Sequence, residues 1–291
     1  MIVSMAARLA FLLLLLPALA LAKPVRWETL PLPPAMPQAS TTGHVDVKDA
    51  TLYYATYGKG EPVILLHGGL GNADHWAFQV VELANHYHVI VIDSRNQGRS
   101  TFSKSKVSYH AMAADVVAVM DHLGLASAAI VGWSDGGEIA LDLAIHSSAR
   151  VAKLFVFGSN YDANGSKPRK PGGSSTFNAY ATKCRSDFLK ISKNPKAYSA
   201  VVESLNPVWR NSVGFTKDQL RSIKAPTIIS DGDHDEIILL DQVKEMAKLI
   251  PNAKLVVFEA TSHFALWQDP VAFNKALLDF LGAPPTKTSS R

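Results

Sequence analysis

The sequence predicts an α/β fold in which a mostly parallel central sheet is flanked by helices. Short, continuous apolar runs alternate along most of the chain with amphipathic stretches of helical periodicity. Continuous apolar runs are typical of parallel strands buried on both faces, and strands that alternate with helices form βαβ units. The chain has 291 residues, 47% of them hydrophobic, which is enough for one substantial core.

The expected elements follow this alternation. An alternating segment, HVDVKDATLYYATYG (44–58), surrounds a turn-like KDA and predicts an antiparallel hairpin. The predicted parallel strands are PVILLH (62–67), HVIVID (88–93), AAIVG (128–132), LFVFG (154–158), PTIIS (226–230) and KLVVF (254–258). The predicted helices are SYHAMAADVVAVMDHLG (108–124), GEIALDLAIH (137–146), LDQVKEMAKLI (240–250) and DPVAFNKALLDFLG (269–282).

Residues 1–22 have the features of a signal peptide. Arg8 precedes an apolar stretch from Leu9 to Ala22 that ends in Ala-Leu-Ala. This stretch is short for a bilayer-spanning helix, which needs about 20 residues. We expect cleavage after Ala22, a secreted or periplasmic location and no stable membrane anchor after cleavage. An uncleaved N-terminal anchor is the alternative. A Pro-rich lead, residues 23–42, follows the signal peptide.

The charge pattern argues against a nucleic-acid partner. The formal net charge is +4, and the basic residues are scattered. The nearest basic run, Lys167–Lys170, lies in a Pro/Gly/Ser-rich segment and is typical of a solvated loop. Cys184 is the single cysteine, so no intrachain disulfide can form, and we expect it to be a buried small hydrophobe. Asn164 begins an N-G-S glycosylation signal that matters only in a eukaryotic host.

The regular alternation breaks between residues 158 and 226. We divide the chain into a core of residues 43–158 and 223–282 and a helical lid of residues 159–222. Within the lid, 175–192 and 195–206 predict helices, and a third helix is expected near Thr216. Insertions of this length in α/β enzymes are usually functional. Phe177, Tyr180, Phe188 and Trp209 would either contact a substrate or pack the lid helices.

The segment Gly132-Trp133-Ser134-Asp135-Gly136 has the pattern G-x-S-x-G directly between a predicted strand and a predicted helix. In that context the pattern predicts a nucleophile elbow, a sharp turn that holds the serine in a strained backbone conformation. The glycines are needed because side chains at those positions would collide with the neighbouring backbone. A Gly-rich turn with an incidental serine is the alternative.

A serine hydroxyl needs a base and an orienting acid to act as a nucleophile. His263 is the best candidate for the base, because it follows the last strand and precedes the final helix. The acid should come from the segment SDGDHDEII after the strand 226–230. Asp235 ranks first and Asp233 second. A calcium loop is excluded here, because its sixth and twelfth positions would need Gly and Glu.

An oxyanion hole requires two backbone N–H donors. One should be the N–H of Asp135, directly after the serine. The other should come from HGGLGN (67–72), where Gly69 is the first choice and Leu70 the next. This loop lacks both the spacing and the lysine of a phosphate-binding loop.

Five motifs give the chain its resemblance to a known family. HGG, DSRNQGRS, GWSDGG, GDHDEII and SHFALWQDP each stand where the α/β-hydrolase superfamily carries a motif, across residues 43–281. Within that superfamily the chain is most similar to the lidded serine esterases and C–C-bond hydrolases. GWSDGG is similar to the elbow of valacyclovir-hydrolase-like esterases.

The resemblance implies a catalytic triad of Ser134, Asp235 and His263. It excludes relatives with an aspartate nucleophile, such as haloalkane dehalogenases and epoxide hydrolases. Asn96 departs from the family pattern, since relatives usually carry glycine there. Asparagine tolerates a left-handed backbone better than most residues, so we expect the loop to keep its conformation.

Together these patterns predict an exported serine hydrolase that cleaves a small to medium carboxylic ester through an acyl-enzyme intermediate. Its partner would be a small-molecule substrate contacted by Leu70 and Trp133, and no metal or organic cofactor is implied. The sequence does not encode the oligomeric state. The alternatives are a C–C-bond, lactone or amide hydrolase with the same triad, and a slow-turnover ligand-binding protein of the same fold.

Asp135 has two interpretations. In the first, its carboxylate accepts hydrogen bonds from the first N–H groups of the following helix or from a neighbouring loop. Alternatively it borders the pocket and favours substrates that carry an amine.

Overall fold

The computed structural model describes residues 25–168, 172–211 and 214–283, so the predicted signal peptide lies outside the described residues. Its strands form one eight-stranded sheet in the order β1-β2-β4-β3-β5-β6-β7-β8. The strands are β1 (Thr41–Val47), β2 (Ala50–Tyr57), β3 (Pro62–Leu66), β4 (His88–Ile92), β5 (Ala128–Trp133), β6 (Val151–Phe157), β7 (Thr227–Gly232) and β8 (Ala253–Phe258). β1 and β2 form the expected antiparallel hairpin, and β3 to β8 run parallel. The predicted mostly parallel sheet is confirmed.

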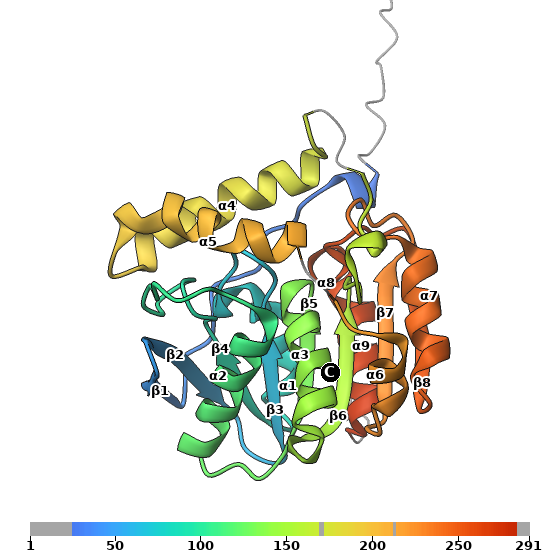
Figure 1. The fold of residues 1–291 in the computed structure, drawn as a ribbon, viewed down its shortest axis with the longest axis horizontal. Coiled ribbons are helices and arrows are strands. Elements are labelled where there is room, and N and C mark those ends of the chain that lie inside the picture. Colours follow the sequence, from blue (N-terminus) through green and yellow to red (C-terminus); the bar gives the residue numbers. More distant parts are fainter. Residues whose placement is uncertain (1–24, 169–171, 212–213, 284–291) are drawn as a thin grey trace, which may run out of the picture.

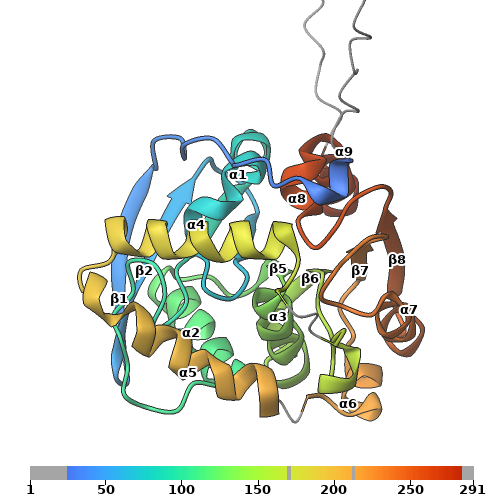
Figure 2. The same cartoon turned by 90° about the horizontal axis from the view of Figure 1, so that it is seen from above.

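Helices cover both faces of this sheet, as the two views show (Figure 1, Figure 2). The helices are α1 (Ala77–Leu83), α2 (Tyr109–His122), α3 (Asp135–His146), α4 (Ser175–Ile191), α5 (Tyr198–Asn211), α6 (Lys217–Ser222), α7 (Leu240–Leu249), α8 (Ala265–Gln268) and α9 (Pro270–Leu281). α2, α3, α6 and α7 share a hydrophobic cluster on one face, and α1, α8 and α9 share a cluster on the other.

The central strands contribute to both clusters by alternation. In β3, Ile64 and Leu66 point to the α2–α3 side, while Val63 and Leu65 point to the α1–α9 side. All four are buried, because successive strand residues face opposite layers and both layers are covered. This explains why the parallel strands appear in the sequence as continuous apolar runs rather than as alternating ones.

Two long helices, α4 and α5, lie across the edge of the sheet where the parallel strands end (Figure 1). They fall within the lid predicted at residues 159–222. α6, the last helix of that range, has another place: Leu220 belongs to the core cluster of α2, α3 and α7. α4 and α5 are therefore the part of the insertion that covers the sheet edge.

The structure adds elements that the sequence patterns did not indicate. α1 lies between β3 and β4, and the short α8 precedes α9. Each has few turns, so its apolar residues show little periodicity. Asn96 adopts the expected left-handed conformation, with φ of 67°. In the described residues, no helix is both long enough and apolar enough to cross a bilayer.

Candidate active site

Ser134 lies at a sharp turn between β5 and α3. Its backbone has φ of 55° and ψ of −124°, a conformation that residues other than glycine rarely adopt. In the fully described stretch from Ala128 to Ala144, it is the one residue that is not buried. The turn therefore strains a single residue and presents that residue at the surface of the sheet edge.

Glycines make this turn sterically possible. A Cβ at Gly132 would lie 2.2 Å from the carbonyl oxygen of Gly136. A Cβ at Gly136 would lie 2.1 Å from the carbonyl oxygen of Leu66 at the end of β3. Both distances are shorter than any van der Waals contact, so the two flanking positions of the G-x-S-x-G motif have no room for a side chain.

Asp235 and His263 form a buried pair at the ends of β7 and β8. The Nδ1–H group of His263 donates to Asp235 Oδ2 over 2.6 Å. The other carboxylate oxygen of Asp235 accepts from the backbone N–H groups of Ile237 and Ile238. Of the two acid candidates, Asp235 is thus the one that contacts the histidine. Asp233 is partly exposed and pairs with a neighbouring imidazole.

The environment of this pair favours both charged forms. Burial alone would lower the pKa of His263, but the charge and hydrogen bond of Asp235 raise it above its ordinary value, with smaller contributions from Glu236 and Asp135. Burial would raise the pKa of Asp235, yet the imidazole and the hydrogen bonds around the carboxylate hold it below its ordinary value. The imidazole is therefore a stronger base than an isolated histidine.

Ser134 and His263 line the same cavity. Within the described part of the chain, their side chains share no direct hydrogen bond. Such a contact is often long in a substrate-free enzyme and shortens when substrate binds. The indole of Trp133 is fully buried, and its Nε1–H donates to the carbonyl oxygen of His263 over 3.0 Å. Trp133 also borders the cavity, but its hydrogen bond positions the loop that carries His263.

The loop after β3 lies directly against the elbow. A Cβ at Gly68 would lie 3.2 Å from Ser134 Cβ, and Gly69 and Leu70 line the cavity. His67 holds this loop: its Nδ1–H donates to the carbonyl oxygen of Gly68, and its Nε2 accepts from the backbone N–H of Ser94. Burial lowers the pKa of His67 to about 4, so it stays neutral and keeps both bonds.

Asp135 begins α3, so its N–H has no helical carbonyl to bond one turn earlier. Its side chain caps nothing within its own helix. The carboxylate accepts from Nε1–H of Trp209 in α5, at 2.9 and 3.0 Å, and from the hydroxyl of Tyr109 in α2, at 3.1 Å. It also lines the cavity. The helix-capping interpretation is therefore wrong, and the carboxylate joins the elbow to the lid.

The cavity beside Ser134 has a volume of about 920 Å³. The lid contributes Phe177, Tyr180 and Trp209 to its walls, whereas Phe188 packs against Tyr198 between the lid helices. The hydroxyl of Tyr180 also donates to the carbonyl oxygen of Gly69. Three of the four lid aromatics named from the sequence therefore face the site.

Asp231 is a buried carboxyl that the sequence patterns did not connect with the triad. Its Oδ1 accepts from the N–H of Gly232, while its Oδ2 has no partner as long as the group is ionised. Burial and the charge of Asp235 raise the pKa of Asp231 well above its ordinary value. A protonated Asp231 can donate to Asp235, an interaction that lowers the pKa of Asp235.

Two further groups at the cavity were missed. Glu138 is buried one turn after Asp135, and burial followed by the charge of Asp135 raises its pKa well above the ordinary value. The spacing of three residues, which puts two acids on one side of the first turn of α3, was a signal for it. Lys167, expected in a solvated loop, lines the cavity and donates from Nζ to the carbonyl oxygen of Asp235.

Comparisons with known proteins agree with this geometry. Residues 61–168 match the sequence family of the alpha/beta hydrolase fold. The chain is 30% identical over 273 residues to a non-heme haloperoxidase of Rhodococcus erythropolis, covering 81% of this chain and 98% of that one. The chain belongs to the α/β-hydrolase family, and it is a hydrolase.

Relatives within this family differ in their reactions. The chain is 28% identical over 268 residues to a 2-hydroxy-6-oxo-6-phenylhexa-2,4-dienoate hydrolase of Comamonas testosteroni, which covers 81% of this chain and 93% of the relative. It is also similar to the solved structure of Est816, an N-acyl homoserine lactone degrading enzyme, with a TM-score of 0.65 and 29% identity over 82% of this chain and 100% of that one.

The role of Asp231 can be tested by two substitutions. Asp231→Asn keeps an N–H donor for Asp235, so we expect hydrolytic kcat to stay close to that of the unaltered protein. Asp231→Leu removes the donor, and kcat should fall by roughly tenfold to a hundredfold, since a hydrogen bond to a charged group contributes about 1.5–3 kcal/mol. Thermal unfolding of both variants controls for loss of fold. Equal activity of the two variants would contradict the role of the Asp231 proton.

Proposed function

We propose that this chain is an exported serine hydrolase that cleaves a small to medium carboxylic ester through an acyl-enzyme intermediate. The observation that carries the proposal is the strained, accessible Ser134 beside a cavity that His263 also lines, with Asp235 2.6 Å from the histidine. A polar serine held in such a conformation amid buried neighbours is expected where the strain serves a reaction.

In the first step Ser134 Oγ attacks the acyl carbon of the ester. Since Nδ1 of His263 carries the proton bonded to Asp235, the neutral ring has Nε2 free to accept the serine proton. The N–H groups of Gly69 and Asp135 stabilise the oxyanion that forms on the carbonyl oxygen. The imidazolium then gives its proton to the leaving alcohol, and an acyl group remains on Ser134.

Water completes the reaction. His263 accepts a proton from the water as it attacks the acyl-enzyme, and the same proton returns to Ser134 Oγ when the acid leaves. Throughout both steps Asp235 stays ionised and stabilises the imidazolium. Apart from the substrate and water, these steps use side chains and backbone groups of the chain.

The cavity supports a substrate of modest size. A volume of about 920 Å³ lies within the range of pockets for small molecules. Lactones are the second candidate substrate class, because a lactone is a cyclic ester and the lactone-degrading Est816 matches this chain over 82% of its length. The same serine mechanism opens a lactone ring without releasing a separate alcohol.

Turnover of p-nitrophenyl esters of increasing acyl length tests the serine mechanism. We expect measurable hydrolysis by the purified protein and a loss of roughly 10⁴-fold or more in Ser134→Ala, because the nucleophile is absent. Ser222→Ala is a control, since that exposed hydroxyl on α6 donates to the carbonyl oxygen of Gln219 and does not line the cavity. Activity that survives in Ser134→Ala would overturn the mechanism. An N-acyl homoserine lactone measured in parallel distinguishes the two substrate classes.

Substrate charge tests the proposed role of Asp135 in specificity. Its carboxylate is buried and faces the cavity, so an amine on the substrate would be attracted in a poorly solvated site. In Asp135→Asn, kcat/KM for amine-bearing esters should fall by about tenfold or more relative to neutral esters of the same shape. The amide oxygen can still accept from Trp209, which preserves the lid contact. An equal fall for both ester classes would assign Asp135 to lid anchoring alone.

Export rests on the N-terminal pattern of a basic residue, a short apolar stretch and Ala-Leu-Ala. Protein recovered from the medium or the periplasm should have the intact mass of residues 23–291. A mass that retains residues 1–22 would contradict cleavage after Ala22.

A further inference from the structure

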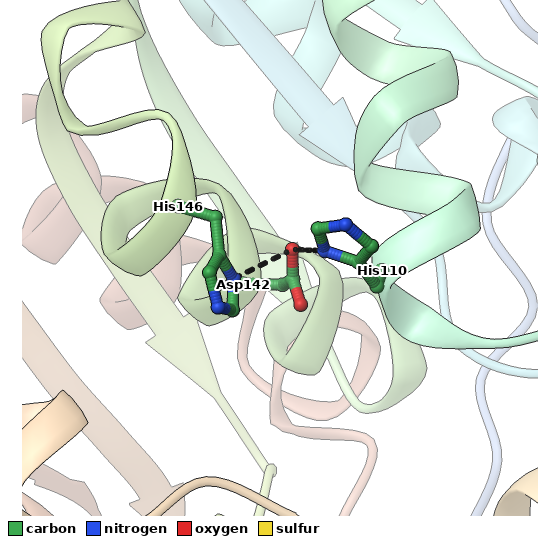
Figure 3. A group of neighbouring side chains, drawn as sticks. All are labelled: His110, Asp142 and His146. Atoms are coloured by element: carbon green, nitrogen blue, oxygen red, sulfur yellow. Dashed lines mark hydrogen bonds and ion pairs between the residues drawn. The ribbon is translucent and has the colours of Figure 1, made fainter.

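Two histidines and an aspartate form a cluster on the outside of the α2–α3 layer (Figure 3). His146 lies four residues after Asp142, so both occupy one face of α3, and His110 comes from the first turn of α2. The nearest nitrogen, oxygen and nitrogen atoms of the three side chains all lie within 4.8 Å of one another. The sequence patterns missed this cluster, because its members are 36 residues apart at the extremes (146 − 110) and lie on separate helices.

The cluster converges on a single oxygen atom. His110 Nδ1 lies 3.0 Å and His146 Nδ1 lies 3.2 Å from Oδ1 of Asp142. The two rings are nearly perpendicular, with centroids 5.0 Å apart, so they approach the oxygen from different directions. Two imidazoles thus compete for one acceptor, and Asp142 has no other side-chain partner among the described residues.

These distances are close to those of a metal coordination sphere. Ligand atoms bonded at about 2.0–2.1 Å around tetrahedral zinc lie roughly 3.3 Å from one another. The separations of 3.0 and 3.2 Å are close to that value, and since all three ligand atoms lie within 4.8 Å of one another, the two exposed imidazoles can turn to complete the site. A cation bound between the three atoms would replace the two imidazole–carboxylate contacts with one bond to each of the three side chains.

The donor set selects the kind of cation. Two imidazole nitrogens with one carboxylate oxygen suit zinc and related transition metals, whereas calcium and magnesium prefer sites built from oxygen. Both histidine side chains are largely accessible, at 69% and 40%, while Asp142 is 5% exposed. The site is therefore open to ions from solvent and has a fixed carboxylate at its base.

We propose that His110, Asp142 and His146 bind one zinc-class divalent metal ion that joins the start of α2 to the end of α3. The ion would lie outside the catalytic cavity, whose lining residues do not include these three. The bound ion would nevertheless affect the catalytic cavity. Tyr109, next to His110, bonds to Asp135 at the elbow, so fixing the first turn of α2 also fixes a wall of the cavity.

Titration of zinc chloride into the full chain without an affinity tag tests the site by calorimetry. We expect one ion per chain and a rise in Tm when zinc is added, because the ion binds the folded arrangement of two helices. His110→Ala and His146→Ala should each weaken binding by at least about tenfold, the lower end of the effect of disturbing a metal site. His44→Ala, an exposed histidine on β1, should bind zinc like the unaltered protein.

The alternative is a carboxylate that simply accepts two hydrogen bonds, and it predicts a different result. In that case the zinc titration would give no measurable heat, or zinc binding would persist in His110→Ala and His146→Ala because it occurs at other surface groups. Either result would overturn the proposal. Because both histidines are exposed, the two variants should remain folded, and thermal unfolding without zinc verifies this.

Discussion

The constraint on which the structure depends is the turn that forces Ser134 into a left-handed conformation at the end of β5. This turn is possible only because Gly132 and Gly136 let three backbone segments, from β3, β5 and α3, meet without side chains between them. The same close approach brings the loop after β3 against the serine. The strained conformation persists because the buried strands on either side leave the chain no other path. One steric requirement thus fixes the nucleophile and the adjacent backbone donors together.

The lid is bound to this elbow by polar contacts rather than by apolar packing alone. Trp209 of α5 donates to Asp135, and Tyr180 of α4 donates to the carbonyl oxygen of Gly69. Further along α4, Asp187 contacts the buried His75 over 3.1 Å. Each contact joins a lid helix to a segment beside the serine, so movement of the lid would change the loop and the elbow directly. Tyr180 and Trp209, which make two of these contacts, also line the cavity.

The sequence was sufficient to predict the α/β architecture and the position of Ser134, because both depend on local patterns. Apolar runs indicated β3 to β8, and the position of Ser134 between a strand and a helix indicated the elbow. The sequence ranked Asp235 above Asp233 without deciding between them, since both follow β7 and the path of that loop decides which carboxylate meets the imidazole. The hydrogen bonds of Tyr109 and Trp209 to Asp135 could not be predicted for a similar reason, because they come from packing between helices far apart in the chain.

Several acidic side chains surround the cavity, and their environments shift their pKa values in different directions. Burial raises the pKa of Asp135, Glu138 and Asp231, and no cation lies directly against any of their side chains in the described residues. Asp235 is equally buried, but an imidazole and two backbone N–H groups bond to its carboxylate, and the interactions with His263 and Asp231 lower its pKa. Of these four buried acids, Asp235 is the one whose pKa is lowered, and its charge lies against Nδ1 of His263. That charge stabilises the imidazolium that forms when His263 acts as a base, and a proton donated by Asp231 helps to lower the pKa of the Asp235 carboxyl.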